Sequence, residues 1–221
     1  MELSILYEDA DVVAVDKPAG LLTHGEGESA EKWFLEKYPA VTFERPYAHR
    51  LDRETSGVLV FAKNKAAHDF LRKAFTDREV KKEYLAFVYG VPKEKKGTIN
   101  FDIGRSRKDF RLRSAQPKAK GKLREALTRY EVIGIDAEGK HALLRLNPET
   151  GRTHQIRVHL KAIHHPIVGD KLYAAGHAPD LGFDRLGLHA HKLDLPLPSG
   201  ARILIESPIP SELQKATGRF K

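Results

Sequence analysis

A polar stretch at residues 49–57 leads directly into a continuous apolar run at residues 58–62, and this junction constrains the fold more than any other part of the sequence. An apolar run of this kind after a glycine indicates a strand that is buried on both faces. If the chain before the turn is extended, Arg50 and Asp52 point to one face and Leu51 to the opposite, buried one. The pattern therefore predicts a carboxylate beside an arginine at a surface, held at the base of a buried strand.

Two interpretations of Asp52 follow from this setting. A nearby arginine favours the ionised carboxylate, which suits a nucleophile or a counter-charge better than a general acid. The same two side chains also fit an ordinary surface ion pair, which contributes roughly 0 to 1 kcal/mol. The spacing alone leaves both interpretations open.

Other segments extend the pattern along the chain. Residues 49–57 are His-Arg-Leu-Asp-Arg-Glu-Thr-Ser-Gly, and residues 13–20 are Val-Ala-Val-Asp-Lys-Pro-Ala-Gly. Lys82, Glu83 and Tyr84 form a third segment; residues 151–159 are Gly-Arg-Thr-His-Gln-Ile-Arg-Val-His, followed by His-Pro-Ile-Val-Gly-Asp at 165–170. In content and order, from about residue 5 to residue 198, these segments resemble the motifs of the RluA family of RNA pseudouridine synthases.

The resemblance implies that the protein isomerises uridine in RNA to pseudouridine. It gives Asp52 the role of catalytic nucleophile, and Arg157 the role of pairing with that aspartate. It implies that Tyr84 stacks on the uracil and handles a proton, and that Arg50 fills the space left by the extruded nucleotide. Alternatives remain open at two positions: Tyr84 also fits a packed core residue, and Arg152 rivals Arg157, although a phosphate contact also suits it.

The predicted fold class is α+β, because strands outnumber helices and do not alternate with them strictly. The resemblance implies a long mixed, mostly antiparallel sheet in two halves, with flanking helices and a central active-site cleft. Because the motifs begin almost at the first residue, we expect a single catalytic domain over residues 1–221, without the S4 RNA-binding domain that many relatives carry.

Local patterns predict the individual elements. Ser29 and Asn64 fit N-caps of two helices, and Thr153 fits the cap of a third that contains Arg157. In the second helix the spacing predicts an apolar face made of Ala67, Phe70, Leu71, Ala74 and Phe75. Strands are expected at residues 5–7, 12–15, 58–62, 84–89, 99–103, 127–135, 141–146, 186–195 and 203–206, before a basic C-terminal tail.

The formal net charge is +8, and it is concentrated in one segment. Between residues 105 and 124 nine basic residues face the single acid Asp109: Arg105, Arg107, Lys108, Arg111, Arg113, Lys118, Lys120, Lys122 and Arg124. Such a patch is typical of proteins that bind a polyanion, and we assign RNA contacts to its first five members and to Arg50 and Arg152. A solvated basic loop is the alternative.

Composition narrows the other possibilities. The chain has no cysteine, which excludes thiolate catalysis and disulfides, and no run approaches the roughly 18 to 20 apolar residues of a membrane span. The histidines show no recognisable metal-ligand spacing, so we expect no metal. The reaction that the resemblance implies needs no outside reagent, so we expect no cofactor. We expect a cytoplasmic monomer whose partner is a transfer RNA stem-loop or ribosomal RNA.

Two other functions compete with the isomerase. One is a catalytically silent RNA-binding module, in which the basic patch matters and Asp52 does not. The other is a glycosylase that would release free uracil. The string His-Arg-Leu-Asp also resembles the kinase catalytic loop, but a leucine intervenes and no glycine-rich nucleotide loop is present.

Overall fold

The computed structural model describes residues 2–107, 109, 112–115, 117–178 and 180–221. Over these residues the fold is α+β, with four helices and a large, mostly antiparallel sheet, which confirms the predicted class. The chain divides into two compact units, Met1–Lys82 with Ala190–Pro208 and Glu83–His189 with Ile209–Lys221.

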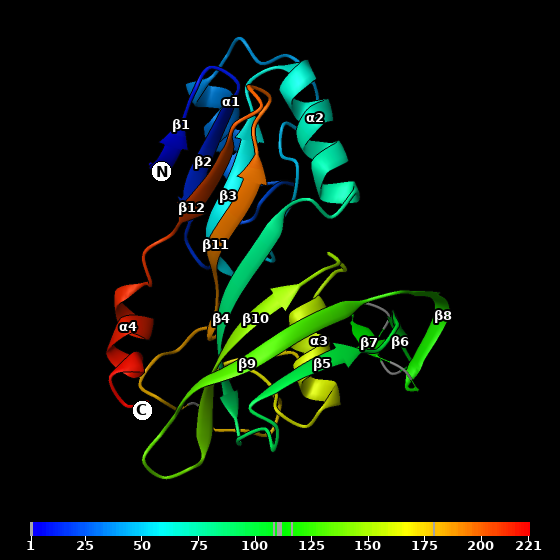
Figure 1. The fold of residues 1–221 in the computed structure, drawn as a ribbon, viewed down its shortest axis with the longest axis vertical. Coiled ribbons are helices and arrows are strands. Elements are labelled where there is room, and N and C mark those ends of the chain that lie inside the picture. Colours follow the sequence, from blue (N-terminus) through cyan, green and yellow to red (C-terminus); the bar gives the residue numbers. More distant parts are fainter. Residues whose placement is uncertain (1, 108, 110–111, 116, 179) are drawn as a thin grey trace. The chain divides into compact units, whose positions relative to one another are not determined.

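The first unit contains a mixed sheet and two helices (Figure 1). Its strands follow the order β1-β2-β3-β11, and β12 pairs with β11. The pairs β1–β2, β2–β3 and β11–β12 are antiparallel, whereas the arrows of β3 and β11 point the same way in Figure 1. The bounds are β1 Ser4–Glu8, β2 Val12–Lys17, α1 Ala30–Lys37, β3 Ser56–Ala62, α2 Lys65–Thr76, β11 Leu188–Pro196 and β12 Arg202–Glu206.

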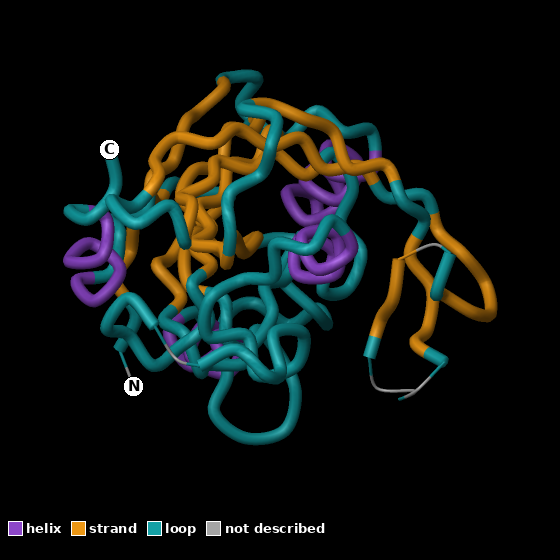
Figure 2. The backbone as a smooth tube through the Cα atoms, turned by 90° about the horizontal axis from the view of Figure 1, so that it is seen from below, coloured by secondary structure: helices purple, strands orange, loops and turns teal. Residues whose placement is uncertain are grey.

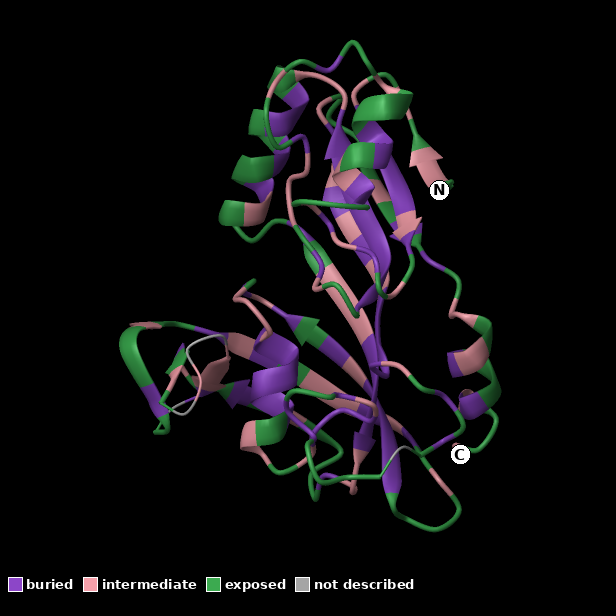
Figure 3. Cartoon of the chain, turned by 180° about the vertical axis from the view of Figure 1, so that it is seen from behind, coloured by how far each residue is buried: buried purple, intermediate pink, exposed green. Residues whose placement is uncertain are grey.

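The two helices of the first unit cover opposite faces of its sheet. Leu71 of α2 belongs to the same buried cluster as Val58 and Val60 of β3. On the other face, the ring of Phe34 in α1 stacks on that of Phe61, with centroids 4.6 Å apart. Strand β3 is therefore buried along its whole length, as predicted, and it is drawn entirely in the buried colour in Figure 3.

Both predicted caps of this unit are confirmed. The Ser29 hydroxyl accepts from the N–H of Lys32, and the Asn64 side chain accepts from the N–H of Ala67. The predicted apolar face of α2 is wrong at Phe70, which is exposed. The buried face extends instead on its other side to His68, which lies about 100° further round the helix than Ala67.

The second unit contains a four-stranded part of the large sheet in the order β4-β10-β9-β5 and a separate three-stranded sheet in the order β7-β6-β8. Figure 2 shows the three short strands apart from the other strands of this unit. The bounds are β4 Lys81–Tyr89, β5 Lys96–Asn100, β6 Ile103–Ser106, β7 Arg113–Ala115, β8 Ala119–Arg124, β9 Leu127–Ile135, β10 His141–Pro148, α3 Gln155–Ala162 and α4 Ser211–Thr217.

Helices again cover both faces of the sheet. Leu160 of α3 packs in one cluster with Ala86 and Leu144, and Leu213 of α4 packs in another with Leu85 and Leu143. Because neighbouring residues of a strand point to opposite faces, α3 and α4 lie on opposite sides of β4 and β10. Among the residues described, no helix combines the length and the apolar character needed to cross a membrane.

Three predicted elements differ in this unit. The strand expected at 99–103 is broken, because β5 pairs with β9 while β6 belongs to the small sheet. In the segment between β5 and β6, the carbonyl oxygen of Phe101 lies 3.0 Å from Nε2 of His159 and is hydrogen-bonded to it. Thr153 does not cap α3: the N-cap is His154, in the left-handed conformation at φ 57°. The segment predicted as a basic C-terminal tail contains the helix α4, which is packed against the unit through the buried side chains of Leu213 and Ala216.

Candidate active site

The segment that carries Asp52 is extended and has the predicted alternation. Leu51 is buried, Arg50 is exposed and Asp52 is half-buried. A turn follows, in which the N–H of Thr55 donates to the carbonyl of Asp52 at 3.1 Å, and β3 begins one residue later. Asp52 therefore lies at the base of a fully buried strand.

A threonine fixes this segment from one side. The buried hydroxyl of Thr23 donates to the carbonyl of Leu51 at 2.9 Å and accepts from its N–H at 3.1 Å. Both backbone groups of the residue before Asp52 are thus held by one side chain. This restricts the direction in which the Asp52 side chain leaves the backbone.

A buried lysine fixes it from the other side. The ammonium of Lys17 is completely buried and donates to the carbonyls of Pro18, Leu21 and Arg53, at 2.9, 2.8 and 3.1 Å. Three acceptors satisfy the three N–H donors of an ammonium. Gly20 and Arg53 add two reciprocal bonds, each of 2.9 Å. Lys17 belongs to one of the sequence motifs, but this role was not predicted. Its acceptors are backbone carbonyls, which every residue has, so the residue types give no sign of them.

The imidazole of His49, three residues before Asp52, is neutral. Its Nε2 accepts from the N–H of Val60 at 3.2 Å, and its ring stacks on Phe75 with centroids 4.8 Å apart. Burial of the ring, assisted by the positive charge of Lys82, lowers the pKa of His49 to about 3. An uncharged ring is required here because a protonated Nε2 could not accept this bond.

In the second unit, Arg157 is buried and forms a two-bond fork with a carboxylate. Its Nε and Nη2 donate to Oδ2 and Oδ1 of Asp170, both at 2.8 Å. Asp170 also accepts from the N–H groups of Leu172 and Tyr173 at 3.0 Å. Four donors to one carboxylate offset the cost of burying its charge. Asp170 belongs to a sequence motif, but no role was predicted for it, because the spacing of residues along the chain does not show which arginine a carboxylate contacts.

Tyr173 connects this arginine to the small sheet. Its ring lies 5.1 Å from the guanidinium carbon of Arg157 and 5.5 Å from the ammonium of Lys161. Its hydroxyl accepts from the N–H of Arg113 at 3.0 Å and is 2.8 Å from Nδ1 of His154. Helix α3, strand β7 and the segment after Asp170 are therefore joined through one side chain.

The remaining predicted residues of this unit are spread over several elements. Tyr84 lies on β4 opposite Leu146 of β10, where it is half-buried and packs against the core beside α3. Arg152 precedes α3, and its Nε donates to the carbonyl of Glu125 at 2.9 Å. Lys108 and Arg111 fall outside the described residues.

The three-stranded sheet carries five residues of the basic patch: Arg105, Arg113, Lys120, Lys122 and Arg124. Arg105 of β6 lies opposite Arg113 of β7 on one side and opposite Lys120 of β8 on the other, so three cations stand abreast. Among the residues that the structure describes, Arg105 and Lys120 have no ion-pair partner. Like charges opposite one another destabilise a sheet, so this row indicates a polyanionic partner.

The comparisons agree with the motifs. The family model for RNA pseudouridylate synthase matches residues 11–162. The chain is 38% identical to the dual-specificity RNA pseudouridine synthase RluA of Vibrio cholerae, over 86% of this chain and 76% of that protein. It is 36% identical to an uncharacterised RNA pseudouridine synthase, YhcT of Bacillus subtilis, over 96% of this chain and 70% of that protein.

A solved structure shares the fold. The human RNA pseudouridylate synthase domain containing 1 superposes with a TM-score of 0.81 at 32% identity, over 95% of this chain and 84% of that one. Together with the family model, this similarity confirms the assignment made from the motifs. The chain belongs to the RluA family of RNA pseudouridine synthases, which are isomerases.

Proposed function

We propose that this enzyme converts specific uridines of ribosomal RNA, transfer RNA or both to pseudouridine, with Asp52 as the catalytic nucleophile. The glycosidic bond between C1′ and N1 breaks, the uracil turns, and a bond forms between C1′ and C5. The hydrogen leaves C5 as a proton and N1 gains one, so atoms and electrons balance without a cofactor or metal. We place the reaction in the cytoplasm, and in a monomer.

The observation that supports Asp52 most strongly is how firmly its backbone is held. Thr23 bonds both backbone groups of Leu51, and Lys17 bonds the carbonyl of Arg53, so the residues on either side of Asp52 are fixed. A nucleophile is effective when its position is set before the substrate arrives. An ordinary surface carboxylate does not need such support.

The other roles come from the family resemblance. Tyr84 stacks on the uracil and exchanges a proton with it. Arg157 keeps the aspartate charged and oriented, and the buried fork with Asp170 makes its guanidinium rigid enough for that role. Arg50, which is exposed, enters the space left when the nucleotide is extruded, and Arg152 contacts a phosphate.

The substrate is a folded RNA with an accessible loop. The basic sheet around Arg105, Arg113 and Lys120 supplies contacts to phosphates, which position RNA without reading its sequence. The relative from Vibrio cholerae is named a dual-specificity enzyme. We infer by analogy that stem-loops from more than one RNA are substrates here.

The test is release of tritium from RNA labelled at C5 of uridine. The parent protein should release tritium to water from unmodified ribosomal and transfer RNA. In Asp52→Asn the rate of tritium release should be lower by a factor of about 10³ or more, while its RNA affinity and unfolding curve stay unchanged. Glu54→Gln is the matched control, since Glu54 is an exposed carboxylate in the same turn.

Each outcome has a clear meaning. Full activity of Asp52→Asn would show that Asp52 is not the nucleophile. Binding without tritium release by the parent would favour the silent RNA-binding module. Release of free uracil instead of pseudouridine would favour the glycosylase.

A further inference from the structure

A stacked pair of rings lies beside the Asp52 segment, and the proposed chemistry does not use it. The rings of His24 and Tyr47 are 5.0 Å apart at centroids and 11° from parallel, and both residues are half-buried. Stacked, partly exposed rings are the surface on which proteins hold unpaired bases of single-stranded RNA.

Polar groups with unused bonding capacity surround this pair. His24 and Arg45 lie close enough to Glu31 to lower the pKa of its carboxyl electrostatically. Among the residues described, neither the Glu31 carboxylate nor the Arg45 guanidinium has a hydrogen-bond or ion-pair partner, and the Tyr47 hydroxyl has none either. One acceptor and several donors thus stand around the ring pair without protein partners.

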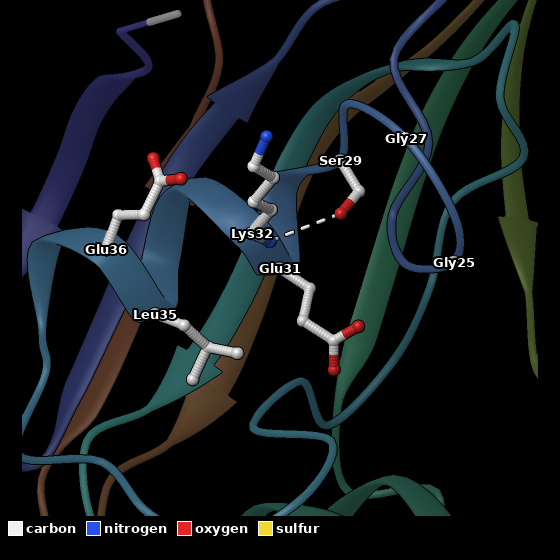
Figure 4. A pocket seen from close by; sticks show the side chains of 7 residues that line it. All are labelled: Gly25, Gly27, Ser29, Glu31, Lys32, Leu35 and Glu36. Carbon is white, nitrogen blue, oxygen red and sulfur yellow. Dashed lines mark hydrogen bonds between the residues drawn. The ribbon is translucent and has the colours of Figure 1, made fainter.

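The Glu31 carboxylate is reachable from solvent. It lines an open hollow of about 430 Å³ between the first turns of α1 and the loop that contains Gly25 and Gly27. Figure 4 shows its side chain pointing away from that of Glu36, which lines the same hollow. Burial nevertheless raises the pKa of Glu31, against the lowering effect of His24 and Arg45. A partly desolvated carboxylate without donors gains most from a ligand that brings one.

Hydrogen bonds connect this cluster to the Asp52 segment. The N–H of Glu31 donates to the carbonyl of Thr23 at 3.0 Å, and the Thr23 hydroxyl bonds both backbone groups of Leu51. The two residues that flank Tyr47 both form hydrogen bonds with β3. The carbonyl of Pro46 accepts from the N–H of Ala62, and the N–H of Ala48 donates to the carbonyl of Val60. The rings, Glu31 and Asp52 therefore belong to one rigid framework.

We propose that His24, Glu31, Arg45 and Tyr47 form a subsite for an unpaired base next to the target uridine, and that the subsite selects a base with an exocyclic amino group. The base stacks on the His24–Tyr47 pair, Glu31 accepts from its amino group, and Arg45 neutralises the adjoining phosphate. This inference rests on the proposed function, because it assumes an RNA loop at Asp52.

The chemistry of the base edges explains the preference. Adenine, cytosine and guanine each present an amino group to an acceptor. Uracil offers only its N3–H, flanked by two carbonyl oxygens that repel a carboxylate. A uracil at this position would leave Glu31 without a good donor.

The test uses stem-loop transcripts with a randomised loop around one fixed uridine. Two quantities are measured for each protein: which loops are converted to pseudouridine, and which are retained in a binding selection without turnover. The parent should disfavour uridine at one position beside the target. Glu31→Gln should weaken that discrimination by about fivefold or more, and Tyr47→Leu should raise KM by about tenfold.

Glu36→Gln is the matched control, because Glu36 lines the same hollow but its side chain points away from that of Glu31. It should retain the discrimination of the parent, and Tyr47→Phe, which keeps the ring, should retain its KM. Discrimination that is the same in the parent, Glu31→Gln and Glu36→Gln would overturn the subsite, as would a parent that shows none.

The two proposals fail in different ways. If the parent forms no pseudouridine on these loops or on cellular RNA, the proposed function fails, and the binding selection still decides the subsite. If the parent is active while Glu31→Gln and Tyr47→Leu leave both selection and KM unchanged, only the subsite fails.

Discussion

The Arg157–Asp170 pair shows how strongly one residue can depend on another in this fold. Both side chains are almost inaccessible to water, with exposures of 5% and 0%, and they meet through two hydrogen bonds. Removing one member of such a pair leaves the other as an uncompensated buried charge. The pair therefore supports the fold as well as the orientation of the guanidinium.

Replacing Asp170 with alanine should lower the free energy of unfolding by about 3 to 5 kcal/mol, because Arg157 would stay buried without its partner. Denaturant unfolding measures the change, and Asp170→Asn provides a milder variant. The control is Glu149→Gln, which removes an ion pair with Arg129 that is partly exposed, and this change should cost no more than about 1 kcal/mol. Equal costs would contradict the importance of the buried fork.

His49 should make stability fall in acid. The pKa of the folded imidazole, about 3, lies below that of the unfolded chain, near 6.5, so between these values only the unfolded state holds the proton. The free energy of unfolding should therefore decrease as the pH falls below about 6.5, by roughly 2 kcal/mol from this group by pH 5. Above pH 6.5 the group should contribute no pH dependence.

Urea unfolding at several pH values from 7 to 5 tests this sign. His49→Gln keeps a side-chain acceptor for Val60 and should make the profile less steep over this range. His164→Gln, which removes an exposed imidazole, is the control variant. A profile for His49→Gln as steep as that of the parent would contradict the prediction.

At the residue scale, the features that the sequence predicted are those that depend on neighbouring residues along the chain. The alternation of Arg50, Leu51 and Asp52 was foreseeable because a strand has a period of two. The partners of Lys17 and Arg157 were not, because they come from other loops. The pairing of Arg157 with Asp52 stays a prediction, as do the roles of both residues and of Tyr84.

At the scale of elements, the junction of β3 with β11 depends on one glycine. Gly57 has φ +121°, and a Cβ placed on it would lie 2.2 Å from the carbonyl oxygen of Ala190. That contact is with backbone, so it cannot be relieved by a change of rotamer. The start of β3 therefore requires a glycine both for its backbone conformation and for the approach of β11.

Gly57→Ala should cost about 3 kcal/mol or more in the free energy of unfolding, since strain at positive φ adds to the clash. Gly200→Ala in the same unit is the matched control: it also has positive φ, at +86°, but nothing lies within 4 Å of the added Cβ. That variant should lose only about 1 kcal/mol. Thermal or denaturant unfolding compares the two, and equal losses would show that the approach of β11 is not limiting.

Elements with strong local signals were predicted well. Helices α1 and α2 have side-chain caps at Ser29 and Asn64, and β3 is uniformly apolar. The three-stranded sheet was missed because basic residues that alternate with small ones do not resemble a strand packed on a core. Helix α4 was missed because only Leu213 and Ala216 in it are buried, too few to give a periodic pattern.

At the scale of the whole molecule, buried clusters occur in both units, whereas the net positive charge is concentrated in one segment. Each unit has a sheet that is covered by helices on both faces, with its own buried clusters. The charge is uneven: the segment from 105 to 124 carries as much positive charge as the whole chain does net. Five of its basic residues lie on the small sheet, and four of them, Arg105, Lys120, Lys122 and Arg124, are exposed. The electrostatic attraction for RNA is therefore concentrated in one part of the second unit.

This concentration predicts how RNA binding responds to salt. Each phosphate that a cation neutralises on a single strand contributes about −0.7 to the slope of log affinity against log salt. Replacing Arg105, Arg113 and Lys120 together with glutamine should therefore make the slope less steep by about 2, and weaken binding at low salt. Filter binding of unmodified transfer RNA over a range of sodium chloride concentrations measures this.

The control must lose the same charge elsewhere. Lys65, Lys73 and Lys140 are exposed, and each has a carboxylate partner close in sequence. Their combined replacement with glutamine changes the net charge equally but removes no cation from the small sheet. If contacts to phosphates decide the affinity, only the first triple variant changes the slope. If long-range attraction by net charge decides it, both variants change the slope alike, and the small sheet loses its assigned role as the RNA-binding surface.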